Sequence, residues 1–201
     1  QPVTQVEITR AFWLGKTEVT QAQWEAMMGS NPSQFKGSDR PVEHVSYDDA
    51  LEFCRKLTAR ERAAGRLPSG YEYTLPTEAQ WEYACCAGTS GDYAGSLDSM
   101  GWYDGNSGGQ THPVAQKQPN AWGLYDMHGN VWEWCRDWYA GSLPGGTVRD
   151  PVGPSSGSFR VRRGGSWGST ASCCRSAYRG RFVPGYRFNF LGFRLALSSV
   201  P

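Results

Sequence analysis

The stretch Gly129-Asn130-Val131-Trp132-Glu133-Trp134 decides how this chain folds. Its glycine permits a tight turn, and its two tryptophans supply large apolar anchors, which we expect on opposite sides of the segment. Tryptophans in such a setting usually belong to a core. The chain has 9 Trp and 13% aromatic residues, together with 25 Gly and 12 Pro. This composition indicates a core built from aromatic rings and a chain with many turns.

Length and charge exclude several classes of protein. The 201 residues are enough for one domain with a substantial core. The net charge is +1, and no apolar run reaches the length of a membrane span. We therefore expect no nucleic-acid partner and no membrane insertion. The six cysteines form no Cys-x-x-Cys pair, which argues against a zinc ribbon or a thioredoxin-type site.

Periodicity and turn signals predict an α+β domain with short elements. Thr20, Ser46 and Thr77 are the expected helix caps. The expected elements are two short strands within 3–18, helices over 21–28, 47–64 and 78–87, and strands over 71–75, 160–163 and 193–197. Gly, Ser, Asp, Asn and Pro dominate 88–120 and 140–158, which we expect to be loops that carry function or are held by ions and aromatic packing.

Several distinct motifs follow one another along the chain. They are Phe12-Trp13-Leu14-Gly15, Leu75-Pro76-Thr77-Glu78-Ala79-Gln80-Trp81-Glu82-Tyr83, Asn120-Ala121-Trp122-Gly123-Leu124-Tyr125, the stretch at 129–134, Arg163-Gly164-Gly165-Ser166-Trp167 and Gly192-Phe193-Arg194. Together they resemble the formylglycine-generating enzyme (sulfatase-modifying factor) family. The resemblance implies one domain over residues 1–201, with that family's variant of the C-type lectin fold: few helices, short antiparallel strands and long loops.

The resemblance also implies structural calcium and a cysteine pair. The family's first calcium site maps to Asn130, the Val131 carbonyl and Glu133, and its second to Asn106. Taken alone, Asn-x-x-Glu is more often a capping or turn arrangement. Cys85 and Cys174 match the family's structural cysteines, so we expect them in contact or bridged.

Enzymes of this family oxidise a substrate cysteine to formylglycine with two copper-binding cysteines. The first of these positions is Ser169 here, and a serine cannot replace a thiolate ligand of Cu(I). Cys173 and Cys174 are adjacent, so on a strand their side chains would diverge. We therefore expect no copper and no catalytic residues. A formylglycine-generating oxidase and an undiversified regulatory member of the family remain the alternatives.

Residues 164–195 form an irregular segment in which small residues give way to clustered aromatics. This segment resembles the variable region of proteins diversified by diversity-generating retroelements, in which miscopied adenines vary asparagine codons. Such codons can encode every residue at the proposed varied, ligand-binding positions, and Asn189 would be unaltered. These positions are Gly168, Ser169, Thr170, Ser172, Cys173, Gly180, Arg181, Phe182, Val183, Tyr186, Phe188, Asn189 and Phe190.

The proposed face has the composition of a protein-binding surface. We expect the rings of Phe182, Tyr186, Phe188 and Phe190 at its apolar centre, with Ser169, Thr170 and Arg181 at its edge. The partner would be a protein or another macromolecule, and display at a bacterial cell surface would suit such a receptor. The alternative is an ordinary family loop, in which these four rings are buried within the molecule.

Overall fold

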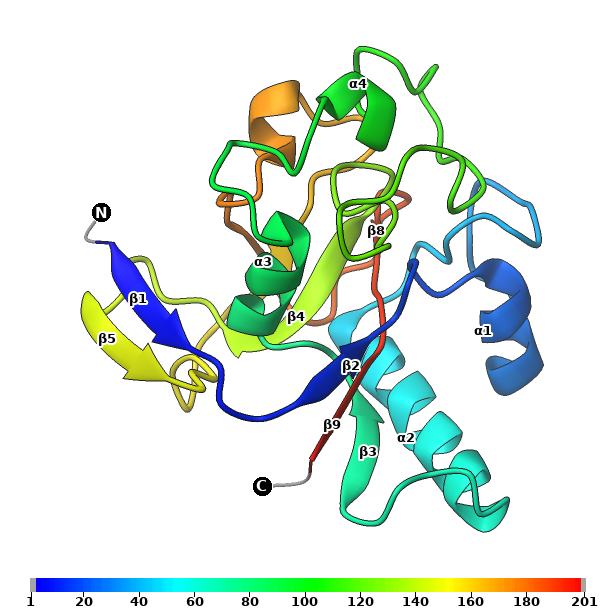
Figure 1. Cartoon of the computed structure of the whole chain (residues 1–201). Helices are drawn as coiled ribbons and strands as arrows, with labels where there is room; N and C mark the ends of the chain where they lie inside the picture. Colours follow the sequence, from blue (N-terminus) through cyan, green and yellow to red (C-terminus); the bar gives the residue numbers. More distant parts are fainter. Residues whose placement is uncertain (1–2, 200–201) are drawn as a thin grey trace.

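The computed structural model describes residues 3–199, and Figure 1 shows how its elements are arranged. The strands form three small sheets. The first is a parallel ribbon of β1 (Thr4–Glu7) and β5 (Gly146–Arg149). The second is antiparallel, in the order β2 (Phe12–Leu14), β9 (Ala196–Ser199) and β3 (Tyr71–Thr74). The third has the order β7 (Gly180–Phe182), β6 (Arg160–Arg163), β4 (Trp132–Trp138) and β8 (Leu191–Gly192).

The three expected helices are confirmed, and each begins at the expected cap. They are α1 (Gln21–Met28), α2 (Tyr47–Ala63) and α3 (Glu78–Cys86). Thr20, Ser46 and Thr77 each accept a hydrogen bond from the N–H three residues on, within a complete capping box. Among residues 3–199, none of the helices is long and apolar enough to cross a membrane.

The expected strand over 193–197 is wrong at its start, because β9 begins at Ala196. The preceding residues bond to a loop instead of a neighbouring strand. The Phe193 carbonyl accepts from Val19 N–H at 3.0 Å, and the Leu195 carbonyl accepts from Gly15 N–H at 2.7 Å. The two stretches expected as loops also contain short elements, namely the single turn α4 (Leu97–Met100) and strand β5.

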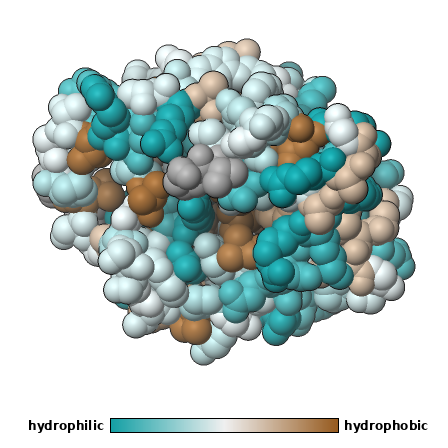
Figure 2. Space-filling view, turned by 90° about the horizontal axis from the view of Figure 1, so that it is seen from below, coloured by the Kyte–Doolittle hydropathy of each residue, from teal (hydrophilic) through white to brown (hydrophobic). Residues whose placement is uncertain are grey.

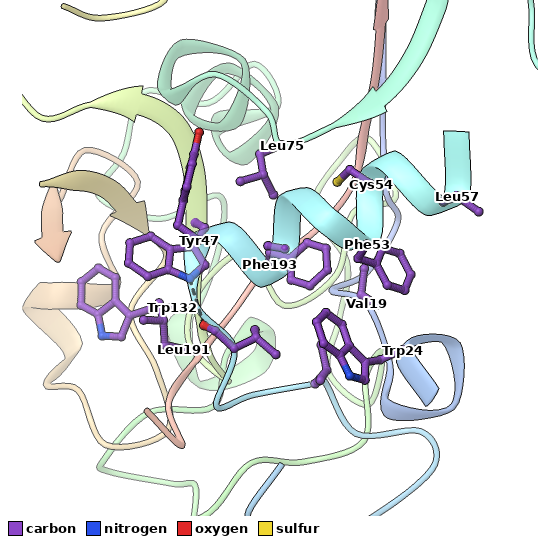
Figure 3. Close-up of a cluster of buried hydrophobic side chains, with 14 residues drawn as sticks. Val19, Trp24, Tyr47, Phe53, Cys54, Leu57, Leu75, Trp132, Leu191 and Phe193 are labelled. Carbon is purple, nitrogen blue, oxygen red and sulfur yellow. Dashed lines mark hydrogen bonds between the residues drawn. The ribbon is translucent and has the colours of Figure 1, made fainter. Parts of the chain in front are cut away.

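The main core lies between α1, α2 and the third sheet, and Figure 3 shows its aromatic centre. Trp24 stacks on Phe53 with ring centroids 5.6 Å apart, and both rings meet Phe193 edge-on. Trp132 and Trp134 both belong to this core. The expectation that they anchor opposite sides is therefore wrong, because alternate residues of a strand share one face.

The carboxylate of Glu133 is wholly buried and binds three donors. Arg194 donates from Nε and Nη2, each at 2.7 Å, and Trp81 donates from Nε1 at 2.7 Å. Arg194 also donates to the backbone oxygens of Gly15 and Tyr125. One buried ion pair therefore joins β4, α3, two loops and the segment between β8 and β9.

We expect Arg194→Met to lower the free energy of unfolding by about 3–5 kcal/mol, because it leaves the buried Glu133 carboxylate without its counter-charge. Urea unfolding followed by tryptophan fluorescence measures this loss. The control is Arg187→Met, which removes an exposed ion pair to Asp49 at 2.7 Å and should cost less than about 1 kcal/mol. Equal losses in the two variants would contradict the central role of the buried pair.

Candidate binding surface

A buried turn fixes the start of the proposed variable segment. Gly164 and Gly165 have φ angles of 95° and 77°, and a Cβ on Gly165 would meet the Cys174 sulfur, so only glycine fits. The next residue but one, Trp167, donates its backbone N–H to the Asn130 carbonyl at 2.9 Å. Its ring Nε1 donates to the Asn189 carbonyl at 2.9 Å. Trp167 therefore joins the start of the segment to its end.

The four rings expected at the centre of the face do gather into one group, which we call the aromatic cluster: Phe182, Tyr186, Phe188 and Phe190. Phe188 stacks on Phe190 with centroids 4.9 Å apart and an interplanar angle of 9°. Phe182 stacks on Phe188 at 5.2 Å. Tyr186 packs against both Phe182 and Phe188, with centroids 6.0 and 5.8 Å away. These distances are typical of aromatic pairs in contact.

The aromatic cluster is partly open to solvent. Tyr186 is 50% exposed, and the three phenylalanines are half-buried against the main core. The cluster is therefore open to solvent mainly at Tyr186, while its three phenylalanines are only partly exposed. They form an apolar surface whose inner side packs against the main core.

The frame holds this segment mainly through backbone carbonyls. Backbone N–H groups of His44, Tyr47 and Trp132 donate to the carbonyls of Phe188, Pro184 and Phe190 at 2.8–2.9 Å. The N–H of Asp104 donates to the carbonyl of Ser169 at 3.0 Å, and the Tyr93 hydroxyl to that of Ala171 at 2.7 Å. Every amino acid has a backbone carbonyl. These hydrogen bonds therefore do not depend on which side chain the accepting residue carries.

The first part of the segment turns through a 3-10 helix, Ala171–Cys174, and presents small residues. Gly168, Thr170 and Ser172 are exposed, while Ser169 and Cys173 are half-buried. The Ser169 hydroxyl accepts from Ser166 N–H at 3.1 Å and so closes the buried turn. Val183 lies beside the aromatic cluster and is 36% exposed, and Asn189 Nδ2 donates to Gln34 at 3.1 Å.

Two of the thirteen expected positions do not lie on this face. Gly180 is buried, and a Cβ there would lie 2.8 Å from Arg162 Cγ and 3.0 Å from the Trp132 ring. Arg181 is exposed, but its guanidinium lies over Tyr139 and Phe159. Successive residues of strand β7 point to opposite faces, so Arg181 points away from the ring of Phe182. The expected edge position of Arg181 is wrong for this reason.

Sequence reasoning missed Arg162, which lies beneath the aromatic cluster. Its Cζ is 4.1 Å from the centroid of Trp132 and 4.0 Å from that of Phe182. Arg162 pairs across the sheet with Gly180, where the missing side chain makes room for it. No motif marks this residue, and a glycine opposite an arginine is visible only when the strand register is known.

Two grooves of about 470 and 640 Å³ lie elsewhere, next to the β1–β5 ribbon and α3. Neither is lined by any of the thirteen expected positions. Seen from below, the molecule carries hydrophobic patches separated by hydrophilic side chains (Figure 2). The aromatic cluster thus resembles a contact surface for a macromolecule more than a pocket for a small ligand.

The side chain of Asn106 closes a local turn, and that of Asn130 joins its own segment to the loop at His112. Asn130 Oδ1 accepts from His112 N–H at 2.9 Å, and Asn106 Oδ1 accepts from Tyr103 N–H at 3.0 Å. Both amide oxygens are thus occupied by protein donors. Neither amide is directed toward Glu133, whose oxygens bind Arg194 and Trp81.

Two carboxyls that the sequence did not single out lie near Glu133. Both carboxyl oxygens of Glu18 and Oδ1 of Asp126 are buried without a donor among residues 3–199. Burial raises the pKa of Asp126 to about 6 and that of Glu18 well above its usual range. One guanidinium, from Arg194, faces three carboxyls, so protons or a cation must balance the remaining charge. Within the described residues, no three His, Cys, Asp or Glu side chains converge on a possible metal position.

Cys85 and Cys174 are both free thiols in the structure, so the expected bridge is not formed. Cys85 Sγ lies 3.8 Å from His128 Nε2 and 3.6 Å from the Ser176 hydroxyl, while the Cys174 sulfur packs against Gly165. The Cys174 carbonyl bonds His128 Nδ1 at 2.8 Å. Burial raises the pKa of each thiol to about 12, so both are protonated at neutral pH.

Comparison with known proteins gives relatives of more than one kind. The chaperone protein LppX of Paenibacillus barcinonensis is 34% identical over 218 residues, covering 85% of this chain and 74% of that protein. The formylglycine-generating enzyme of Mus musculus is 33% identical over 210 residues, covering 94% of this chain. The match covers only 52% of the mouse enzyme, so this chain corresponds to about half of that protein.

A solved structure extends the comparison. Treponema denticola variable protein 1 superposes with a TM-score of 0.88 at 38% identity, covering 95% of this chain and 85% of that one. The expected α+β architecture, a variant of the C-type lectin fold, is confirmed, as is the resemblance to a variable protein. The family model for the sulfatase-modifying factor enzyme 1-like domain matches residues 1–199. The chain therefore belongs to the sulfatase-modifying factor enzyme 1-like family.

Proposed function

We propose that this chain is a non-catalytic, receptor-like protein that binds a protein target through the face around the aromatic cluster. We further propose that this face is diversified by a diversity-generating retroelement. The observation that carries the proposal is the way the segment is held. Its carbonyls bond the frame, while Gly168 is exposed and the side chains of Thr170, Ser172, Val183 and Tyr186 face solvent. Substitution at such positions costs little stability.

The composition of the face supports the same function. Stacked rings give a large, rigid contact area with little conformational entropy to lose, and the small residues around the 3-10 helix can adapt to a partner's shape. The similarity to Treponema denticola variable protein 1 extends over 95% of this chain, which favours a shared mode of binding. The proposed contact set excludes Gly180, which is buried against Arg162 and Trp132, and Arg181, which points to the opposite face of β7.

Ser169 argues against the family's oxidative chemistry. Its hydroxyl bonds the Ser166 N–H and hydroxyl at 3.1 and 3.0 Å, a structural role within the buried turn. A hydroxyl is a poor ligand for Cu(I), which prefers thiolates. The similarity to formylglycine-generating enzymes keeps an oxidase as the competing function. Tight Cu(I) binding by this chain would favour the oxidase.

Sequencing the encoding locus tests diversification. We expect a near-copy of the 3′ end of the gene next to a reverse transcriptase gene. In that copy, the codons for exposed positions such as Thr170, Val183 and Tyr186 should be rich in adenine. The codon for Trp167 should be the same in both copies and serves as an internal control. A locus without such a repeat would contradict diversification and favour an undiversified family member.

We also propose a structural calcium ion near Glu133. The donor-free oxygens of Asp126 and Glu18 support it, because calcium prefers hard oxygen ligands. Its role would be to hold loops that lack strand pairing.

Removal of calcium should therefore lower the Tm. For calcium at about a hundredfold over its Kd, we expect a Tm about 5–10 °C above that in EDTA, measured by differential scanning fluorimetry. Magnesium at the same concentration is the control and should stabilise less. An identical Tm in calcium and EDTA would show that protons, rather than calcium, balance the carboxyls of Asp126 and Glu18.

A further inference from the structure

The arginines of the C-terminal quarter draw their counter-charges from the rest of the chain. All 19 Asp and Glu residues precede residue 151, so each later arginine must find a carboxylate elsewhere. Most of them do. Arg163 and Arg179 pair with Glu78, Arg187 with Asp49, Arg194 with Glu133, and Arg175 lies 3.8 Å from Asp92.

Arg162 is different, because it is partly buried and lacks a polar partner. Its guanidinium lies between the faces of Trp132 and Phe182, with Cζ 5.9 Å from the centroid of Phe190. Its Nε is buried without an acceptor. Among residues 3–199, no hydrogen bond or ion pair satisfies this guanidinium.

The guanidinium groups of the other two arginines that lack a carboxylate partner are satisfied by other means. Arg160 Nη1 donates to the Arg136 carbonyl at 2.7 Å. Arg181 is exposed, so water can solvate its guanidinium. Arg162 alone among the arginines after residue 150 combines burial with the absence of both an anion and a hydrogen-bond acceptor in the described chain.

Keeping a cation in this position costs free energy, because part of its hydration is lost. Burial lowers the pKa of Arg162 to about 10, so the side chain stays charged at neutral pH while it has lost part of its hydration. The two aromatic faces offset only part of this loss. A carboxylate can accept two parallel hydrogen bonds from a guanidinium and neutralise its charge, so it would restore what burial removes.

We propose that Arg162 binds a carboxylate of the protein target, supplied by an Asp or Glu side chain whose apolar neighbours pack on the aromatic cluster. This inference rests on the proposed function, and it specifies the chemistry of the partner. The location supports it, because the guanidinium lies against Phe182 of the aromatic cluster and forms no ion pair within residues 3–199. An acidic, partly apolar segment of a protein complements such a surface in both charge and shape.

Arg162 precedes the segment 164–195, so it would be a constant anchor beneath a changeable face. Targets that differ in shape would still share an acidic residue at one position. A fixed position for Arg162 also explains the glycine at 180. Gly180 lies opposite Arg162, and its missing side chain leaves room for the arginine.

A random peptide library displayed on phage and selected on the immobilised chain tests this inference. We expect selected peptides to carry Asp or Glu beside aromatic or aliphatic residues. Changing that acid to its amide should weaken binding by about tenfold to a hundredfold, the range for a hydrogen bond to a charged group. In Arg162→Gln, the acidic and amide peptides should bind equally well.

Two variants serve as controls. Arg181→Gln removes an arginine that also lacks a carboxylate but lies on the opposite face of β7, so it should preserve the difference between the peptides. Arg162→Lys retains the charge without the planar fork, and should preserve part of the difference. Thermal unfolding verifies that each variant is folded before binding is compared.

The outcomes separate the inference from the proposed function. Peptides whose binding is lost in Tyr186→Ser, but which lack an acidic residue, would overturn the anchor and leave the binding face intact. The anchor would also be overturned if changing acid to amide weakened binding to Arg162→Gln as much as binding to the original chain. If no selected peptide depends on Tyr186, the proposed function fails, and the anchor fails with it.

Discussion

The buried ion pair between Glu133 and Arg194 is the constraint on which the rest of the structure depends. Glu133 lies in the central strand β4, and Arg194 lies at the end of the proposed variable segment 164–195. The pair therefore fixes the end of that segment to the middle of the fold. Trp81 shares the same carboxylate and brings α3 into the arrangement. A charge pair with no exposure to water tolerates little displacement, because separating it would leave a charge unpaired.

The start of the segment is fixed by a different device, the buried glycine turn at 164–165 and the two hydrogen bonds of Trp167. Between these two attachments, β7 and β8 pair with β6 and β4, and hydrogen bonds to backbone carbonyls hold the rest of the segment. This separation of roles connects fold to function. The frame forms hydrogen bonds with the main chain of the segment. The exposed side chains of the face therefore remain available to the proposed partner. The arrangement also accounts for a segment that is rich in aromatics without belonging to a closed core.

Local chemistry could be predicted from the sequence, and strand register could not. The caps at Thr20, Ser46 and Thr77 each depend on residues three apart, so the helices were found nearly to the residue. The aromatic cluster was also found, because its rings are close in sequence. The error at Arg181 concerns which face of β7 the residue occupies, and the error at Gly180 concerns the arginine that lies opposite it; both depend on the pairing with β6. Side-chain environments formed by residues far apart in the sequence could not be predicted either. Arg162 takes its character from Trp132 in one strand and Phe182 in another, and only the folded chain brings them together.

The central claim is that the frame tolerates exchange of side chains on the face and not beneath it. Its most direct test compares the free energies of unfolding of Tyr186→Ser and Gly180→Ser, determined from urea denaturation. Tyr186 is half exposed, so its loss should cost less than about 1 kcal/mol. A side chain at Gly180 would press on Arg162 and Trp132 and should cost about 1–3 kcal/mol. A loss at Tyr186 that equals or exceeds the loss at Gly180 would contradict the account.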